Sequence, residues 1–454
     1  MSPPLRFFES SLTGWGRHQQ SSCHVVRPES RAAIGEALRV GPGPILPRGL
    51  GRSYGDAALN TGGSVVDMTA LDGVLHFDDT SGLLRCEAGL SLERLLAHFV
   101  PRGWFPWITP GTKFVTIGGC IANDVHGKGH HSQGSFASCV LSMRVALPNG
   151  ELREVSRDAD PELFWANFGG MGLLGVVVDV TLRLRRIETT FYRQRSVPVR
   201  DLDELLERMA EHDASHPYSV AWVDPLCTGK SLGRGVLTVG DHATRADLAD
   251  HPSPLRLGPP QRLVVPAELP EATLNPVTLR AVNAVIRAML TRGGQFAHYE
   301  QFFYPLDLIK HWNRGYGRRG FTQYQFVVPR SGGAQTLRAI LEAIAASGNL
   351  PFLNILKHLG APSGGHLSFP MDGYTFAIDL PIRDGTPALT RRLDAMVVDA
   401  GGRIYLGKDA FMTAESFRAM YPRLDEWMAV KRRVDPEGRF ASDQSRRLGL
   451  TPRL

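Results

Sequence analysis

Residues 110–140 read PGTKFVTIGGCIANDVHGKGHHSQGSFASCV and are rich in glycine, histidine and small residues. A backbone that carries few large side chains can lie flat against a bulky planar group. The small residues that would form such a surface follow one another closely: Gly118, Gly119, Cys120 and Ala122. His126 and Lys128 come directly afterwards. The stretch therefore predicts a site at which main chain, with two polar side chains beside it, meets a large ligand.

A second glycine cluster, PRGLGRSYGD, occupies residues 47–56 and has glycine at positions 49, 51 and 55. Glycine adopts positive φ without a Cβ clash, so successive N–H groups in such a turn can converge on one anion. Taken alone, the cluster fits a phosphate-binding turn and an ordinary connection equally well. Together with residues 110–140, it suits an extended diphosphate cofactor that is held mostly by main-chain donors.

A third cluster, with Gly170, Gly172 and Gly175, matches the G-x-G-x-x-G spacing of a dinucleotide-binding turn. That motif needs a strand before it and a helix after it, so that the pyrophosphate meets the helix N-terminus. Here residues 176–184, VVVDVTLRL, predict a β-branched strand instead. We therefore expect a tight turn at this place and no Rossmann-type site.

The three histidines His126, His130 and His131 raise the alternative of a metal site. Zinc requires a fourth ligand or a carboxylate at suitable spacing, and Asp124 is the only nearby acid in the stretch. We therefore expect no metal. The five cysteines are odd in number, far apart and never in a Cys-x-x-Cys motif, which favours reduced, buried thiols over disulfides.

A chain of 454 residues exceeds the size at which a single core stops growing, so we expect two domains. The sequence contains no apolar run long enough to span a bilayer. The first twenty residues lack an apolar segment behind a basic head, so we expect no export signal and a cytoplasmic protein.

The net charge of +6 favours anionic partners, which include nucleic acid, a phospholipid surface and a phosphorylated metabolite. Basic residues concentrate near the end of the chain, in VKRRVDPEGRF (430–440) and QSRRLGLTPRL (444–454). The aromatic residues that a single-strand nucleic-acid binder would place between them are missing, so we expect no nucleic acid. The pattern instead predicts a solvated or membrane-facing basic surface.

The distribution of predicted strands and helices divides the chain into three segments and predicts an α+β fold. Residues 1–190 contain short strands and one helix, in which Leu92, Leu95, Leu96 and Phe99 share a face. Residues 191–402 alternate helices with strands, as expected for a sheet with helices on one side. Residues 403–454 are helical and are expected to return to the first domain.

The middle segment contains a proline-rich stretch at residues 251–276, with seven prolines in 26 residues. Proline removes a backbone donor and fixes φ, so this stretch predicts a long surface loop, which could act as a mobile flap. An amphipathic helix is expected to follow it. The apolar side of that helix carries Val282, Val285, Ile286 and Met289.

The two glycine turns belong to a longer series of motifs that resembles a known family. The series continues with ELFWANFGGMGLLGVV (162–177), WNRGYGRRGFTQYQFVVP (312–329), FLNILKHLG (352–360), GGRIYLGKD (401–409), AMYPRLDEW (419–427) and VDPEGRFASD (434–443). In this order it resembles the flavoprotein oxidase subunit of decaprenylphosphoryl-β-D-ribose 2′-epimerase, among the FAD enzymes of the vanillyl-alcohol-oxidase (PCMH) type. The similarity covers nearly the whole chain.

The resemblance implies a discontinuous FAD-binding domain, made of residues 1–190 and 403–454, and a substrate domain at 191–402. It implies that FAD contacts Arg48, Gly49, Leu50, Gly51, Arg52, Ser53, Tyr54, Gly111, Thr112, Thr116, Gly118, Gly119, Ala122, Asn123, His126, Gly127, His131, Ser132, Gly175 and Tyr405. Many relatives attach FAD to a histidine in the first turn. This chain has Gly51-Arg52-Ser53 there, so we expect non-covalent FAD, with arginine available for the pyrophosphate.

The same resemblance implies oxidation of the 2′-hydroxyl of a polyprenyl-phosphoryl ribose to a ketone. The implied catalytic residues are Lys408, His126, Gln325 and Tyr54, with Lys408 as proton acceptor or as binding group. The implied substrate-binding residues are Lys128, Trp222, Gln325, Lys357, Thr375 and Lys408. Actinobacterial members carry asparagine and cysteine where this chain has Thr375 and Ala377, which puts the shape of the pocket in question.

A separate NAD(P)H-dependent reductase would complete the epimerisation, and a lipid-linked substrate implies peripheral contact with the inner membrane. Two other functions stay open at this point. One is an aldonolactone- or alditol-type oxidase that uses oxygen and shares the FAD turns. The other is a non-catalytic protein that binds phosphate or nucleic acid through its positive charge.

Overall fold

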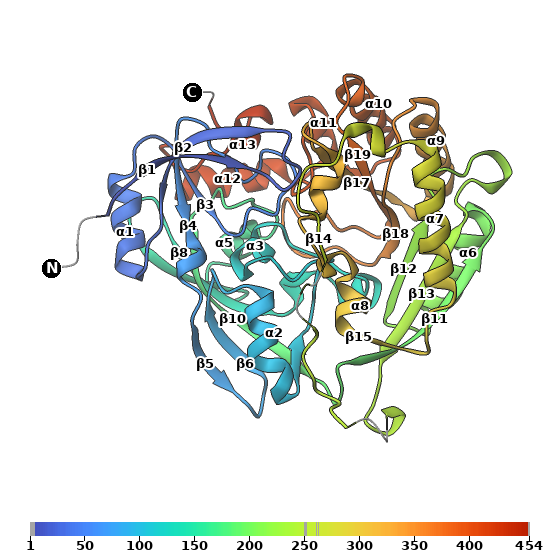
Figure 1. Cartoon of the computed structure of the whole chain (residues 1–454). Helices are drawn as coiled ribbons and strands as arrows, with labels where there is room; N and C mark the ends of the chain where they lie inside the picture. The colour runs from blue at the N-terminus through green and yellow to red at the C-terminus, as the bar shows by residue number, and fades with distance from the viewer. Residues whose placement is uncertain (1–4, 249–251, 260, 262, 453–454) are drawn as a thin grey trace.

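Short β-branched runs between glycine turns form two sheets in the first lobe of the protein (Figure 1). The structure is a computed structural model that describes residues 5–248, 252–259, 261 and 263–452. The first sheet has the order β1 (Phe8–Thr13), β2 (Gln20–Val26), β4 (Ser64–Asp67) and β3 (Ile45–Arg48). The second has the order β5 (Val74–Asp78), β6 (Leu83–Glu87), β10 (Val176–Arg186), β8 (Val140–Ala146) and β9 (Leu152–Ser156), and β7 (Trp104–Pro106) pairs with the end of β10.

Five helices accompany these sheets. They are α1 (Arg31–Val40), α2 (Leu92–Phe99), α3 (Ile117–Ala122), α4 (His130–Gln133) and α5 (Pro161–Asn167). The expected helix is confirmed in α2, because Ser91 caps it and its four apolar residues are all buried. The glycine cluster at 170–175 lies between α5 and β10, so a helix precedes it and a strand follows. That order is the reverse of a Rossmann turn, as the sequence predicted.

The second lobe contains one antiparallel sheet of eight strands. Its order is β15 (Phe296–His298), β11 (Phe191–Val199), β13 (Gly235–His242), β12 (Tyr218–Val223), β18 (Asn354–Leu359), β19 (Gly373–Pro381), β17 (Phe321–Pro329) and β20 (Arg403–Ile404). Three helices cover one face of this sheet: α6 (Leu202–Asp213), α9 (Arg330–Ala346) and α10 (Thr386–Asp399). The expected α+β fold, a sheet with helices packed on it, is confirmed.

Alternation along β17 and β19 decides which side chains face the first lobe. Tyr324, on the helix-covered face, donates a hydrogen bond to Asp394 of α10 at 2.9 Å. Gln325, on the opposite face, contacts His126 of the first lobe. Because successive side chains of a strand point to opposite faces, every second residue of both strands faces the boundary between the lobes. One strand face therefore builds the core while the other is available for a site.

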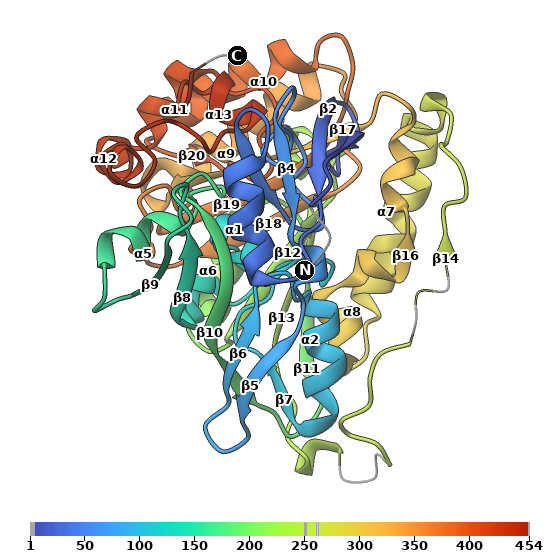
Figure 2. The ribbon, with the colours of Figure 1, turned by 90° about the vertical axis from the view of Figure 1, so that its left-hand side faces the viewer.

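Helix α7 (Pro276–Thr291) follows the proline-rich stretch and lies beside β11 and β13, on the side of the sheet opposite α6 (Figure 2). The helix itself is confirmed. Of its four named apolar residues, Val282 and Ile286 are half-buried and Val285 and Met289 are exposed, while the buried residues of α7 are Leu279 and Asn283. Within residues 252–275 the regular elements are β14 (Leu263–Val264), paired with β16 (Ile309–Lys310), and one 3-10 turn. His251, Pro260 and Arg262 of this stretch lie outside the described residues.

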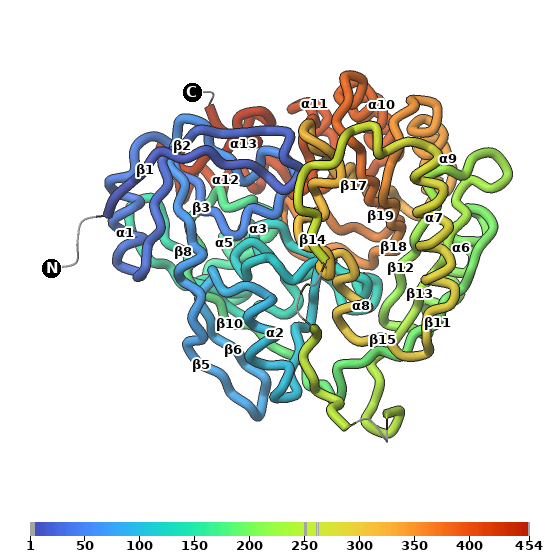
Figure 3. Tube along the Cα trace, in the orientation of Figure 1, coloured from blue at the N-terminus to red at the C-terminus, as the bar shows by residue number. Residues whose placement is uncertain are grey.

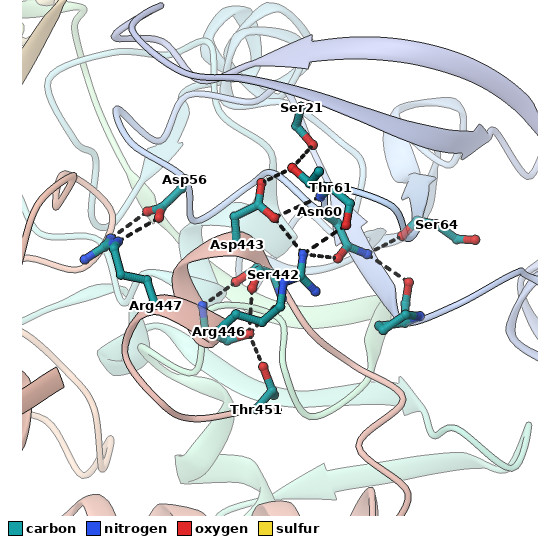
Figure 4. Close-up of polar contacts among 12 residues, drawn as sticks. Ser21, Asp56, Asn60, Thr61, Ser64, Ser442, Asp443, Arg446, Arg447 and Thr451 are labelled. Carbon is teal, nitrogen blue, oxygen red and sulfur yellow. Dashed lines mark hydrogen bonds and ion pairs between the residues drawn. The ribbon is translucent and has the colours of Figure 1, made fainter. Parts of the chain in front are cut away.

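The end of the chain runs back from the second lobe to the first, as the Cα trace shows (Figure 3). Strand β20 still pairs with β17, and α11 (Ala414–Met420) packs on α10. Then α12 (Leu424–Val434) packs against α5, and α13 (Asp443–Arg447) lies against the loop after β3. Asp443 of α13 accepts hydrogen bonds from the amide and the hydroxyl of Thr61, which lies in that loop (Figure 4).

The basic residues near the C-terminus form the exposed surface that the sequence predicted only in part, because Arg432 and Arg433 are exposed and the other described ones are partly or fully buried. Arg447 pairs with Asp56 at 2.6 Å (Figure 4). It also pairs with Asp409 at 2.8 Å, and both carboxylates are buried. Arg446 donates to Asn60 and Asp443, and Lys431 is buried in an ion pair with Asp435. These cations join segments of the fold, so charge in this region serves packing.

The cysteines conform to the sequence expectation, since all five are free and buried. Burial is the first cause that raises the pKa of the Cys86 thiol beyond its ordinary range and the pKa of Cys139 to about 12. These thiols therefore stay protonated and pack as small apolar groups. Among the described residues, no helix is long and apolar enough to cross a membrane.

We predict that Arg447→Met lowers the free energy of unfolding by about 3 kcal/mol, because it leaves two buried carboxylates without their counter-charge. Chemical denaturation followed by tryptophan fluorescence measures the change. The matched control is Arg338→Met, which removes an exposed ion pair with Asp203 and should cost less than about 1 kcal/mol. Equal losses in the two variants would contradict the idea that Arg447 fastens the chain end to the first lobe.

Candidate active site

The two glycine turns meet in space. Thr116 caps α3, and its hydroxyl lies so close to Gly49 that a Cβ placed on that glycine would meet Thr116 Oγ1 at 2.3 Å. Any larger residue at position 49 would separate the turns. Glycine at this place is therefore a requirement for contact between residues 47–56 and residues 110–122.

The first turn presents unused main-chain donors. Among the described residues, the N–H groups of residues 49–53 donate no hydrogen bond. Gly51 has a φ of 63°, a left-handed conformation that side chains rarely adopt. Backbone N–H groups are strong donors that a folded protein leaves unpaired only where water or a ligand reaches them. The turn therefore has free donors that an acceptor-rich group such as a phosphate could use.

The two arginines of this turn differ in what they contact. Arg48 donates to the carbonyl of Ala58 and, at 2.8 Å, to that of Thr13, so its guanidinium holds the fold together. Arg52 lies 4.0 Å above the Trp15 ring and makes no hydrogen bond with the described residues. Its donors are free, and the ring holds its planar group in one orientation. Arg52 is therefore the cation of this turn that could bind an anion.

His126 lies at the centre of the boundary between the lobes. Gln325 donates to His126 Nε2 across 2.9 Å and to Thr375 Oγ1 across 3.0 Å. The other ring nitrogen, Nδ1, is buried and has no partner among the described residues. Burial, and then the charge of Lys357, hold the pKa of His126 well below its usual range. The ring is therefore neutral, and Nδ1 is available to a bound molecule.

A second network of hydrogen bonds begins at Lys408, which follows β20, and includes side chains of β17 and β19. Its ammonium donates to the side-chain oxygen of Gln323, and the amide nitrogen of Gln323 donates in turn to Asp379. Tyr316 donates to the same carboxylate at 2.6 Å. Burial and the charge of Lys357 lower the pKa of Lys408, and Asp379 opposes them. A lysine in this setting can exchange a proton near neutral pH.

Two more lysines face this region. Burial and the neighbouring Lys357 lower the pKa of Lys128 to about 7, and burial lowers that of Lys357 to about 8. The Lys128 ammonium donates to the carbonyl of Phe302, whereas Lys357 makes no hydrogen bond or ion pair with the described residues. Trp222 is buried, and its indole nitrogen has no partner in the described chain. Three cations and one unused donor thus lie where an anionic ligand would satisfy them.

Two aromatic residues expected at the cofactor line the same region. The Tyr405 ring lies 5.1 Å from that of His126, and its hydroxyl donates to the carbonyl of Asn123 at 3.1 Å. Lys408 lies 5.6 Å above the ring of Tyr54, whose own amide donates to Gly407. Burial raises the pKa of the Tyr54 hydroxyl well above its usual range, so the group stays protonated and can donate.

Other residues expected at the cofactor make contacts of a different kind. His131 bonds the carbonyl of His216 at 2.9 Å, and Ser132 donates to that of Pro217, so both link α4 to the second lobe. Thr112 donates to Asp307 at 2.8 Å. Gly175 packs against Val145. A role of these residues in cofactor binding stays a prediction.

The three histidines considered as metal ligands point to different partners. The His130 ring accepts a hydrogen bond from the amide of Gly360, while His131 stacks on His358 with 6.0 Å between the ring centres. Asp124 accepts hydrogen bonds from the hydroxyls of Ser363 and Ser368. Within the described residues no group of three or more potential ligands is close enough to hold a metal ion.

Sequence reasoning missed Gln323, Asp379 and Tyr316. The first two face each other across β17 and β19, two residues away from the pair Gln325 and Ala377. Strand alternation places them on the same face as Gln325, because a side chain and the one two positions away point the same way. A buried aspartate in an otherwise apolar strand was the signal that could have found them.

The comparisons with known proteins agree with this geometry. The FAD binding domain family matches residues 23–156, and the D-arabinono-1,4-lactone oxidase family matches residues 382–448. Decaprenylphosphoryl-β-D-ribose oxidase of Mycolicibacterium smegmatis is 39% identical over 449 residues, which are 97% of each chain. An uncharacterized protein from the mprA 5′ region of Streptomyces coelicolor is 36% identical over 80% of this chain and 100% of its own.

A more distant relative is L-gulono-1,4-lactone dehydrogenase of Mycobacterium tuberculosis, which is 26% identical over 93% of this chain and 95% of its own. The fold and these matches define a FAD-dependent oxidoreductase that acts on a CH–OH group. Within that class, the chain belongs to the decaprenylphosphoryl-β-D-ribose oxidase family.

Proposed function

We propose that this protein oxidises the 2′-hydroxyl of a polyprenyl-phosphoryl-β-D-ribose to the 2′-keto sugar, the first half of an epimerisation to the arabinose form. The observation that carries the proposal is the 39% identity to decaprenylphosphoryl-β-D-ribose oxidase over 97% of both chains. The buried lysines at the lobe boundary support it, because a lipid-linked phosphosugar brings the anion that they lack.

The described residues fit non-covalent FAD. The free amides of residues 49–53 and the unpaired guanidinium of Arg52 would hold the pyrophosphate, and the small residues of α3 leave room for a planar ring. When bound, FAD supplies an acceptor for the hydride of the carbinol carbon. The first turn offers no histidine for a covalent bond, since residues 51–53 are Gly-Arg-Ser.

Lys408 would take the proton of the reacting hydroxyl as the neutral amine, and Gln323 would fix the position of its nitrogen. His126 and Gln325 would hydrogen-bond the sugar or the cofactor through the unused His126 Nδ1 and the amide group. The step would balance, because the alcohol would lose its hydroxyl proton to Lys408 and its carbinol hydride to the bound cofactor and become a ketone.

The phosphodiester of the substrate would lie near Lys128 and Lys357, with Trp222 beside it as an apolar wall and a hydrogen-bond donor. Compact ammonium groups suit phosphate oxygens as point charges. Thr375, whose hydroxyl joins Gln325 to the carbonyl of Phe326, would border the sugar. A separate NAD(P)H-dependent reductase would reduce the keto sugar, and a lipid-linked substrate requires peripheral contact with the membrane.

We predict that anaerobic mixing with a polyprenyl-phosphoryl ribose bleaches the flavin absorption within single turnovers. The matched control is the same lipid phosphate carrying arabinose, whose 2′-hydroxyl has the opposite configuration. Soluble pentitols and 1,4-lactones should react far more slowly, because they lack the phosphate that the lysines would bind. Faster bleaching with a lactone would favour the lactone oxidase function instead, and a colourless protein that takes up no FAD would remove both.

We predict that Arg52→Met weakens FAD binding about tenfold to a hundredfold, the loss expected when a charge-assisted hydrogen bond to phosphate is removed. Titration of the apoprotein with FAD, followed by flavin fluorescence, measures the effect. Arg48→Met is the matched control, because Arg48 bonds carbonyl groups of the fold. It should lower the melting temperature of the apoprotein more than it weakens FAD binding, and the reverse pattern would assign the anion to Arg48.

We predict that flavin reduction rises as the pH increases through about 7, because the neutral amine of Lys408 exists above its pKa. Lys408→Met should slow reduction about a hundredfold or more while FAD stays bound. The charge of Asp379 favours the ammonium form, so Asp379→Asn should move the rising limb of the pH profile to lower pH. Asp379→Glu should restore it. If the rising limb of the pH profile stayed at the same pH in Asp379→Asn, the carboxylate would have only a structural role.

A further inference from the structure

Helix α7 leaves most of its apolar side chains in contact with solvent. It has 16 residues and buries two of them, Leu279 and Asn283. Val277 is 74% exposed, Val285 58% and Met289 69%. An amphipathic helix of a globular protein normally turns its apolar stripe to the core. In α7 this holds only for the side with Leu279, Val282 and Ile286, which are buried or half-buried, whereas the side with Val277, Val285 and Met289 is open to solvent.

The segment before α7 has the same character. Fourteen large apolar side chains are exposed in the described residues, and seven of them fall between residues 257 and 289. We call these seven the docking face: Leu257, Leu263, Val264, Leu269, Val277, Val285 and Met289. Figure 2 shows α7 and the segment with β14 along the same side of the molecule. Such a concentration marks an interaction surface, whereas single exposed apolar residues are ordinary.

The charges around the docking face are positive. Exposed cations lie at Arg256, Arg280, Arg292 and Lys310. In the described part of residues 252–292 the acidic side chains are Glu268 and Glu271, and each is paired with an arginine from elsewhere in the chain. Exposed apolar groups surrounded by unpaired cations are the combination that binds an anionic lipid surface.

The docking face is connected to the candidate active site by short elements. Glu268 pairs with Arg17 of the first lobe, so the segment before α7 lies over the boundary between the lobes. After α7 the chain forms β15 and then α8 (Tyr299–Phe303), and the carbonyl of Phe302 in α8 accepts the hydrogen bond of Lys128. The chain on both sides of α7 therefore contacts elements that border the candidate active site.

We propose that the docking face binds the surface of an anionic lipid bilayer, so that a lipid-linked substrate passes from the membrane into the site without entering water. The proposal rests on the proposed function for its reason, but its test does not depend on catalysis. Val277, Val285 and Met289 insert among the acyl chains, and the arginines bind the headgroups. A second copy of the chain is the competing occupant, and the test separates the two.

The experiment uses the full-length, FAD-loaded protein and sedimentation with phosphatidylcholine vesicles that contain phosphatidylglycerol. The double variant V285E/M289E should bind at least about tenfold more weakly, because it places two charges among the acyl chains. R280Q/R292Q should bind about thirtyfold more weakly at low salt and change little on phosphatidylcholine alone. The matched control is V74E/L75E on β5, where two exposed apolar residues of the first lobe are replaced and binding should not change.

The proposal would be overturned if V285E/M289E bound the vesicles as tightly as the wild type. It would also be overturned if the wild-type protein did not bind anionic vesicles. Conversion of a wild-type dimer into a monomer by V285E/M289E, seen by analytical ultracentrifugation, would assign the face to a second copy. Flavin reduction by a short-chain, water-soluble phosphoryl ribose tests the proposed function separately. V285E/M289E should react with that analogue at the wild-type rate, which shows that the site itself is intact.

Discussion

Burial of positive charge between the two lobes is the constraint on which the site depends. Lys128, Lys357 and Lys408 face one region, and each has its pKa lowered first by loss of water. Asp379 is the carboxylate that acts on this group, and it is held by Tyr316 and Gln323. A protein tolerates buried charge without a counter-ion at a considerable energetic cost, so such an arrangement indicates a place where a ligand completes the balance.

This constraint explains why the site lies at a boundary and not within either lobe. The first lobe offers the free donors of its glycine turn together with Lys128, and the second lobe offers Lys357 on one face of its sheet and Lys408 directly after β20. His126 and Gln325 join the two sets across 2.9 Å. The clamp that Arg447 forms with Asp56 and Asp409 fastens the chain end to the first lobe, and Asp409 directly follows Lys408. The position of Lys408 is thereby fixed by both lobes at once.

Much of the fold and part of the candidate site could be predicted from the sequence. Helix α2 and the strands of both lobes follow from periodicity, and the glycine turns follow from composition. The residues of the lobe boundary came from resemblance, because contacts such as that of His126 with Gln325 join positions 199 residues apart. Gln323 and Asp379 were missed, although strand alternation places them on the face of Gln325. The prediction for the basic C-terminal segment holds for Arg432 and Arg433 but not for Arg447, since sequence does not distinguish an exposed arginine from one that is paired inside the fold.

Thr375 and Ala377 show how the site can change its shape without losing its chemistry. Ala377 lies directly opposite Gln325 in the sheet, so its small side chain leaves space beside the amide. Thr375 receives a hydrogen bond from Gln325 and donates one to Phe326, so the hydroxyl holds the amide in the orientation that reaches His126. Neither residue touches Lys408 through a hydrogen bond, so the contact of Lys408 with Gln323, on which its proposed role as proton acceptor rests, does not depend on these two positions. If the proposed roles hold, specificity for the sugar and competence for oxidation are separable properties of one strand face.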